Sequence, residues 1–127
     1  MTQEYASTQI VTAWPAEQDG QAGYKVKDAE GVVTWKAKKA FEADHVPMGH
    51  TGHLAPHERR VVAEKAVNDD RVIKLTAFRQ TDFYRGLSTL VQQQLEIQLG
   101  AMSLLANVLA DRVDDFTPAP AVESAAK

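Results

Sequence analysis

The chain has 127 residues and a mass of 14.0 kDa, which is enough for one domain with a modest hydrophobic core, or for one domain with an appendage. Apolar residues make up 44% and charged residues 24%, a balance typical of a globular protein and not of a disordered chain. The absence of cysteine excludes disulfide scaffolds, thiol nucleophiles and zinc–thiolate sites. The net charge of −3 gives no general attraction to duplex DNA, so no nucleic-acid partner is expected.

The apolar residues are spread through the chain. No window approaches the ~20 apolar residues of a membrane span, and Met1–Glu4 lacks the basic start of a signal peptide. We therefore expect a soluble, intracellular protein that does not contact a membrane.

Residues 1–47 show the pattern of a small antiparallel sheet with a short helix. Tyr24 and Val26 alternate with Lys25 and Lys27, as in a strand with one face in water. Trp35 is expected to pack under the sheet as part of its core. The three predicted strands are 9–14, 23–27 and 32–35, a tight turn over 28–31 joins the last two, and a helix follows over 36–44.

The pattern changes to a helical period after a linker over 48–56 that is rich in proline and glycine. A helical hairpin is expected over 57–116, entered through Pro56 in a first-turn position, with a break at 80–86 and a second helix from about 88 to 112. The tail at 117–127 is rich in alanine and proline and is expected to be disordered. A sheet followed by helices makes the fold class α+β.

The second long helix carries two apolar stripes on different sides. One antiparallel neighbour covers only one stripe, so a second partner is needed. The N-terminal region could cover part of the second stripe, but self-association along this helix is the favoured interpretation. The first stripe is Leu87, Val91, Leu95, Met102, Leu105 and Leu109, and the second is Leu90, Ile97, Ala101, Leu104 and Val108.

Catalytic patterns are scarce. Gly49 and Gly52 are not part of a phosphate-binding loop, and no nucleophile elbow is present. The adjacent pair Asp69 and Asp70 diverges on a helix and cannot share a proton, so a solvated helix face is expected there. The sequence predicts no enzyme activity, no catalytic residue and no cofactor.

All four histidines lie within thirteen residues, which leaves one alternative open. His53 and His57 are four apart across a helix start, and Asp44 or His50 could complete a nickel or zinc site of a small metal-dependent enzyme. The surrounding prolines and glycines favour the opposite interpretation, a polar linker with no bound metal, because metal sites need rigid support.

Basic and aromatic residues gather at the two ends of the predicted hairpin. In an antiparallel hairpin, Arg112 returns to the neighbourhood of Arg59 and Arg60. Guanidinium groups bind phosphates and aromatic rings stack on bases, so the residues at both ends are candidates for a nucleotide site. The residues at the loop end are Arg79, Phe83, Tyr84 and Arg85.

The hairpin sequence resembles that of two families of phage anti-defence proteins, anti-CBASS protein 2 and the first Thoeris anti-defence family. The similar segments are the helix opening at 54–65, the polar helix middle at 68–71, the loop at 81–83 and the acidic–Arg–hydrophobic triplet at 111–113.

Residues 23–43 are similar to the strand–turn–strand–helix unit that precedes the hairpin in the Thoeris family, so the resemblance covers about residues 9–113. The chain departs from that family at three places: Val32 replaces a tyrosine, Lys36-Ala37 replaces Ser-Pro, and Asp44-His45 replaces Tyr-Arg. At the last place, His45 would be a pH-dependent substitute for an arginine.

The resemblance implies a non-enzymatic, hexameric sponge in the cytoplasm of an infected host cell. Such a protein sequesters nucleotide immune messengers, namely glycocyclic ADP-ribose isomers or cyclic di- and trinucleotides, without degrading them. The alternative is a structural or adaptor oligomer of a phage or prophage with no nucleotide ligand. Phe83 or Tyr84 would stack on a base and Arg85 and Arg112 would bind phosphates, with Arg60, Arg79 and His45 as further candidates.

Overall fold

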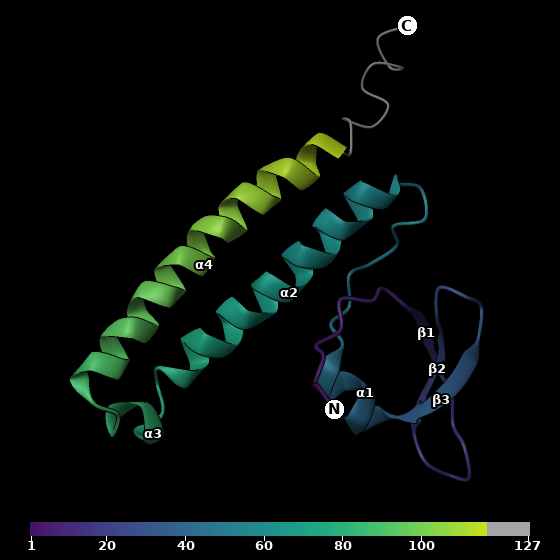
Figure 1. Ribbon diagram of the computed structural model, residues 1–127, viewed down its shortest axis with the longest axis horizontal. Coiled ribbons are helices and arrows are strands. Elements are labelled where there is room, and N and C mark those ends of the chain that lie inside the picture. The colour runs from purple at the N-terminus through teal and green to yellow at the C-terminus, as the bar shows by residue number, and fades with distance from the viewer. Residues whose placement is uncertain (117–127) are drawn as a thin grey trace, which may run out of the picture. The chain divides into compact units, whose positions relative to one another are not determined.

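The computed structural model describes residues 1–116, which divide into two compact units, Met1–His45 and a helical unit that begins at Val46. The predicted α+β class is confirmed: a three-stranded antiparallel sheet with a short helix is followed by two long packed helices (Figure 1). The tail over 117–127, for which disorder is expected, lies outside the described residues. Within the described part of the chain, no helix is long and apolar enough to cross a membrane.

The sheet has the order β1-β2-β3, with β1 at Thr12–Pro15, β2 at Gly23–Lys27 and β3 at Val33–Ala37. β1 begins three residues later than predicted, because Thr12 already pairs with Lys27, the last residue of β2. The predicted turn over 28–31 is present. Asp28 Oδ1 accepts the backbone N–H groups of Glu30 and Val32, each at 2.9 Å. Gly31 takes the positive φ of +88° that this turn requires.

One face of the sheet is covered by α1, Lys38–Asp44. Phe41 of α1 and Val26 of β2 are buried, and the Phe41 ring lies 4.6 Å from the ring of Tyr24. The Tyr24 hydroxyl donates a hydrogen bond of 2.5 Å to Glu42, which raises the pKa of Tyr24 because the proton is held between the two groups. The period-two pattern of β2 is thereby explained: its alternate residues form the small core of this unit.

The opposite face of the sheet carries Trp35, which differs from the expected position under the sheet. Its six-membered ring covers Gly23, where a Cβ atom would come within 2.4 Å of the ring, and its Nε1–H donates to the carbonyl of Ala16 at 2.9 Å. Trp35 does anchor the sheet, but from the open face. Tyr24 and Phe41 already fill the space on the covered face.

The helical unit contains α2 at Pro56–Phe78, the short α3 at Asp82–Arg85, and α4 at Thr89–Phe116. α2 begins at Pro56 as predicted, and Glu58 in its first turn accepts the N–H of Ala55 at 3.0 Å. α4 runs four residues beyond its predicted end. α2 and α4 pack along each other as an antiparallel hairpin (Figure 1).

The polar middle of α2 is divided between the inside and the outside of the hairpin. Asn68 is buried, and its Nδ2–H donates to the carbonyl of Met102 on α4 at 2.9 Å. Asp69 and Asp70 instead form i,i+4 ion pairs on the surface of α2, at 2.7 Å with Lys65 and at 2.9 Å with Lys74. Together with Leu109, whose side chain is 1% exposed, the amide of Asn68 fixes how α4 lies on α2.

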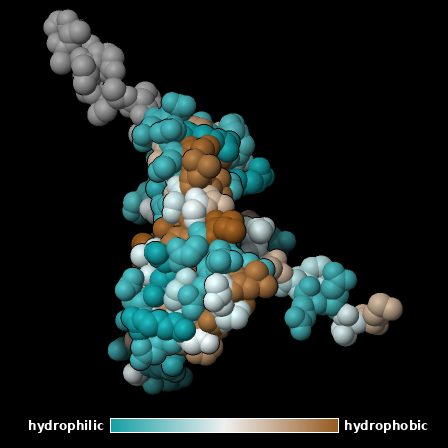
Figure 2. Space-filling view, turned by 90° about the vertical axis from the view of Figure 1, so that its left-hand side faces the viewer, coloured by the Kyte–Doolittle hydropathy of each residue, from teal (hydrophilic) through white to brown (hydrophobic). Residues whose placement is uncertain are grey.

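The second apolar stripe predicted on α4 lies in the open, and we call it the α4 stripe: Leu90, Ile97, Ala101, Leu104 and Val108. Leu90, Ile97 and Leu104 are 63%, 73% and 66% exposed. Figure 2 views the side on which α4 lies in Figure 1, and apolar groups gather there between polar ones. The first stripe is covered only in part: Leu109 is buried in the contact with α2, whereas Val91 and Leu105 are 36% and 38% exposed, so the prediction that one neighbour covers this whole stripe is wrong.

Candidate functional site

The loop end of the hairpin holds four of the predicted binding residues. Thr81 is the N-cap of α3: its side-chain oxygen accepts the N–H of Tyr84 at 3.2 Å, and its hydroxyl donates to the carbonyl of Phe78 at 2.7 Å. The sequence predicted an irregular break here. The N-cap at Thr81 and Gly86 after the last turn explain why four residues of this loop become helical.

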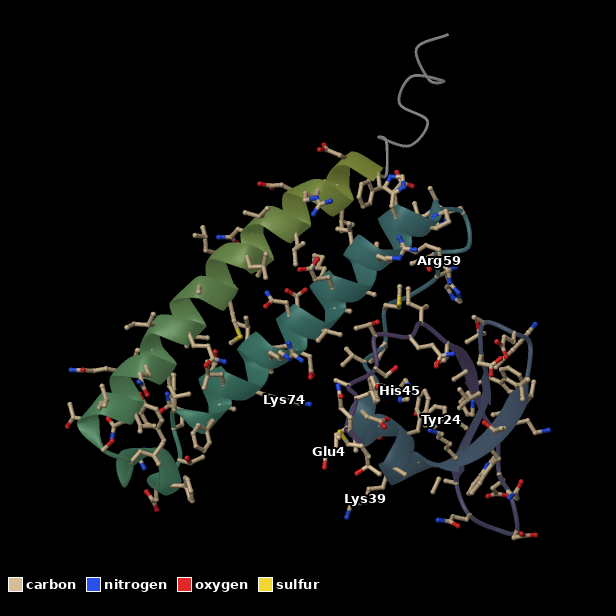
Figure 3. The ribbon with its side chains drawn as sticks, in the orientation of Figure 1. Glu4, Tyr24, Lys39, His45, Arg59 and Lys74 are labelled. Carbon is tan, nitrogen blue, oxygen red and sulfur yellow. The ribbon has the colours of Figure 1, made fainter. Side chains whose placement is uncertain are left out.

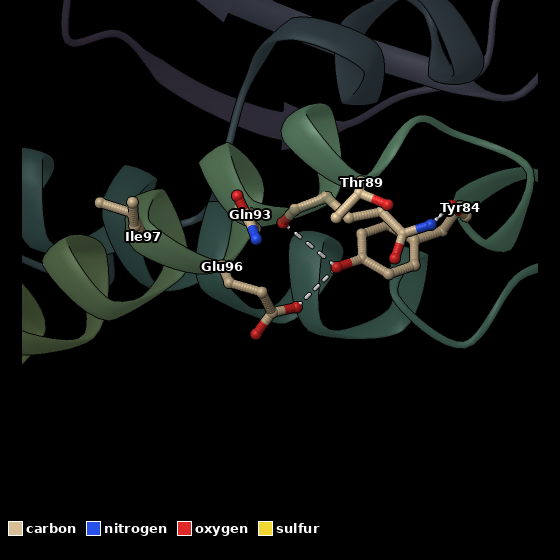
Figure 4. A pocket seen from close by; sticks show the side chains of 6 residues that line it. Tyr84, Thr89, Gln93, Glu96 and Ile97 are labelled. Carbon is tan, nitrogen blue, oxygen red and sulfur yellow. Dashed lines mark hydrogen bonds between the residues drawn. The ribbon is translucent and has the colours of Figure 1, made fainter.

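A hydrogen-bonded triad links this loop to α4. The Tyr84 hydroxyl donates to Glu96 Oε2 at 2.7 Å (Figure 4). Arg79 Nε donates to the same oxygen at 2.6 Å. The two hydrogen bonds hold the pKa of Glu96 below its usual value, and the bond to Glu96 raises the pKa of both Tyr84 and Arg79. Glu96 is therefore an anion that orients the arginine.

Gln92 closes the loop from the other side. Its amide N–H groups donate to the carbonyls of Tyr84, Arg85 and Leu87 at 3.1, 3.3 and 3.0 Å. The Gln92 amide thereby ties the end of α3 and the residues that follow it to α4. Nothing in the sequence pattern singled out Gln92 or Glu96, although Glu96 is the one charge between Gly86 and Ala110, a signal that could have identified it.

Phe83 and Tyr84 are adjacent but lie in different environments. Phe83 is 70% exposed, and its ring is 6.0 Å from that of Phe78. Tyr84 is 8% exposed and meets the edge of Phe78 at 5.8 Å. Of the two residues expected to stack on a base, Phe83 therefore has the accessible ring, while Tyr84 is engaged inside the loop.

Arg85 is held at the surface of the same loop. Its guanidinium donates to Asp82 at 2.5 Å and to the carbonyl of Gln80 at 2.9 Å. A pocket of about 420 Å³ lies beside the loop, lined by Tyr84, Thr89, Gln92, Gln93, Glu96 and Ile97 (Figure 4). Its walls offer amides and one carboxylate and no arginine, so the pocket taken alone is not suited to a phosphate.

The open end of the hairpin carries the other predicted arginines. Arg60 and Arg112 are exposed, and Arg59 donates through Nε to the hydroxyl of the buried Thr51 at 3.2 Å; Figure 3 shows Arg59 in the first turns of α2. The Asn68–Met102 contact sets the antiparallel register. In this register Arg112 lies at the level of the first turn of α2, as the sequence suggested.

His45 lies in the N-terminal unit, at the end of α1. Its ring stacks on Phe41 with the centroids 4.1 Å apart, and its Nδ1 lies 2.6 Å from Asp44 and 3.1 Å from the carbonyl of Phe41 (Figure 3). One ring nitrogen is thus engaged locally. Across residues 1–116, no three histidine or acidic side chains are grouped as a metal site requires, so the structure brings no support to the nickel or zinc alternative.

Comparison with known proteins finds a similarity in the hairpin. A family model described as Sequestin, a family of phage proteins that sequester nucleotides, matches residues 55–115 of the chain. No curated protein and no solved structure matches the chain. The matched segment contains every predicted binding residue except His45.

Proposed function

From the similarity of the hairpin to the Sequestin family we propose that the protein is a phage anti-defence sponge. It binds nucleotide immune messengers, such as cyclic ADP-ribose isomers or cyclic di- and trinucleotides, and withholds them from their host receptors without cleaving them. The match over residues 55–115 is the observation that carries the proposal. Sequestration needs affinity and slow release and no catalytic group.

The two ends of the hairpin supply the groups that such ligands need. At the loop end, Phe83 presents an open ring, and Arg79 is held there by the bond from its Nε to Glu96. At the open end, Arg60 and Arg112 are both exposed. A nucleotide is bound by two kinds of interaction, stacking of its base on an aromatic ring and charge-assisted hydrogen bonds to its phosphates.

Self-association completes the sites in this proposal. Leu90, Ile97 and Leu104 of the α4 stripe are apolar and exposed, and fully burying each such side chain is worth about 1.5–3 kcal/mol. The proposed assembly is a homo-oligomer, a hexamer in line with the resemblance, in which hairpin ends of neighbouring copies share a ligand. The stripe also fits the alternative, a structural or adaptor oligomer without a ligand, so ligand binding and assembly need separate tests.

The binding test is isothermal titration calorimetry of the full chain with cyclic ADP-ribose isomers and cyclic di- and trinucleotides. Phe83→Ala and Arg112→Ala are expected to abolish binding of the messenger that the parent protein takes up. Arg71→Ala, an exposed arginine in the middle of α2, and Tyr5→Ala, an exposed aromatic outside the hairpin, are the matched controls and should bind normally. Unchanged affinity in both test variants would remove these site residues, and no binding of any messenger by the parent would favour the adaptor.

The assembly test is sedimentation velocity on variants of α4. Leu104→Asp places a charge in the α4 stripe and should reduce the particle to the 14.0 kDa chain. Ser103→Asp adds the same charge beside the stripe and should leave the assembly intact. A parent protein that sediments as a single chain at high concentration contradicts the proposed oligomer.

A further inference from the structure

Both tryptophans of the chain lie in one row on the open face of the sheet. Trp14 of β1 pairs with Lys25 of β2, which pairs with Trp35 of β3. Directly paired residues of antiparallel strands project to the same face, so the row reads indole, ammonium, indole. Lys27 and Val33 pair in the next row of this face. We call these five residues the tryptophan face.

The indole of Trp35 is already immobilised. Its ring rests on Gly23, and its N–H is fixed to the carbonyl of Ala16 at 2.9 Å, yet the residue is only half-buried. A rigid aromatic surface of this kind binds a planar ligand at little conformational cost. Trp14 is 40% exposed and Val33 is 47% exposed, so the apolar surface extends on both sides of Lys25.

The charges on this face are cationic. Lys25 and Lys27 are exposed, and within residues 1–116 neither forms a salt bridge. An exposed indole and a half-buried one beside unpaired ammonium groups complement a ligand that combines a flat ring with negative charge. A partner protein that docked through an aliphatic surface would gain nothing from the two ammonium groups.

We infer that the tryptophan face binds a small nucleotide, with its base on the indoles and its phosphates on Lys25 and Lys27. The net charge of the unit limits the size of the ligand. Residues 1–45 carry seven carboxylates against five lysines, a balance that disfavours a polyanion such as single-stranded RNA. The site lies outside the hairpin that matches the Sequestin family, and it stands independently of the proposed function.

Intrinsic fluorescence tests this site selectively, because the helical unit contains no tryptophan. ADP is titrated into the full chain with excitation at the red edge of the indole band, where adenine does not absorb. Emission is expected to be quenched in a saturable way by ADP. Adenosine, which has no phosphate, and inorganic pyrophosphate, which has no base, should each bind far more weakly.

Two variants with a matched control locate the phosphate contact. Lys25→Gln is expected to weaken ADP binding about fivefold, and Lys25→Gln with Lys27→Gln to weaken it further. Lys36→Gln removes an equally exposed lysine from the opposite face of β3 and should leave the affinity unchanged. Phe83→Ala, a hairpin variant, should also leave this signal unchanged, which separates the result from the test of the proposed function.

Three results would overturn the inference. Emission that does not respond to ADP would show that the indoles bind no base. An equal loss in Lys25→Gln and Lys36→Gln would show a general charge effect instead of a site. Tighter binding of a single-stranded oligonucleotide than of ADP, falling steeply with salt, would assign the face to a polymer.

Discussion

The two units leave different kinds of apolar side chain exposed. The sheet carries one exposed and one half-buried indole beside lysines, whereas α4 exposes leucine, isoleucine and valine along a stripe that contains no charge. Aliphatic stripes on helices are typical of contacts between protein chains, and aromatic rings beside cations are typical of planar anionic ligands. Exposed apolar surface therefore has a different meaning in each unit.

The units also differ in what stabilises them. The sheet unit depends on a few aromatic contacts, Tyr24 with Phe41 and Trp35 with Gly23. The hairpin depends on one helix-long interface with a fully buried leucine and one buried amide. A substitution in one unit should consequently have little effect on the stability of the other. Three experiments test the contacts that stabilise each unit, in order of decreasing effect.

The largest effect is expected from Leu109→Ala in the hairpin. Leu109 is 1% exposed, and truncating a buried leucine costs about 2–5 kcal/mol through lost burial and the cavity left behind. Urea unfolding followed by far-UV circular dichroism measures the loss. Ile73→Ala on α2, where the side chain is 67% exposed, is the control and should change stability by less than about 0.5 kcal/mol. Similar losses in both variants would contradict this description of the interface.

A smaller effect, confined to the sheet unit, is expected from Gly23→Ala. The new Cβ atom would meet the ring of Trp35 and the carbonyl oxygen of Lys36, each at 2.4 Å, and such crowding costs about 1–3 kcal/mol. Tryptophan emission should report earlier unfolding while the helical dichroism signal is preserved. Gly100→Ala in α4 is the control. It should not destabilise the protein, because the space around Gly100 is open and alanine favours helix over glycine by about 1 kcal/mol. If both signals shift together in Gly23→Ala, the units do not unfold independently.

The smallest effect is the pH dependence caused by Glu96. The pKa of Glu96 is lower in the folded hairpin than its ordinary 4.5, because Tyr84 and Arg79 donate hydrogen bonds to the carboxylate. A carboxyl of this kind stabilises the fold above its unfolded pKa, and the contribution is lost as pH falls through the folded pKa. The melting temperature of the helical signal should therefore drop as pH falls below 4.5, and Glu96→Gln should flatten that drop. Glu64→Gln, an exposed glutamate on α2, should leave the profile unchanged; a profile equally steep in Glu96→Gln would exclude the triad as its cause.

Much of the architecture could be predicted from the sequence. The alternation around Val26 predicted a strand with one wet face, and Pro56 predicted the start of the first long helix, because both signals depend on neighbouring residues only. The position of the arginines at hairpin ends followed from helix length and antiparallel direction. The stacking and phosphate roles of Phe83, Arg85 and Arg112 stay predictions.

Other features could not be derived from local pattern. Adjacent aromatics such as Phe83 and Tyr84 look equivalent in sequence, and contacts made only in the folded hairpin, such as that with Glu96 twelve residues away, distinguish the buried Tyr84. The position of Trp35 on the open face depends on the register of the strands, because Trp35 pairs with Lys25 and not with a residue of the face that α1 covers.

The sequence by itself determined the element types, their order and the surplus of apolar surface on the last helix, because hydrophobic period and turn residues act over a few positions. The tertiary structure decided which of several neighbouring polar residues lies inside the hairpin. Asn68 rather than Asp69 enters the hairpin, and Glu96 orients Arg79, because these choices depend on the rotation and register of helices that meet only after the chain has folded.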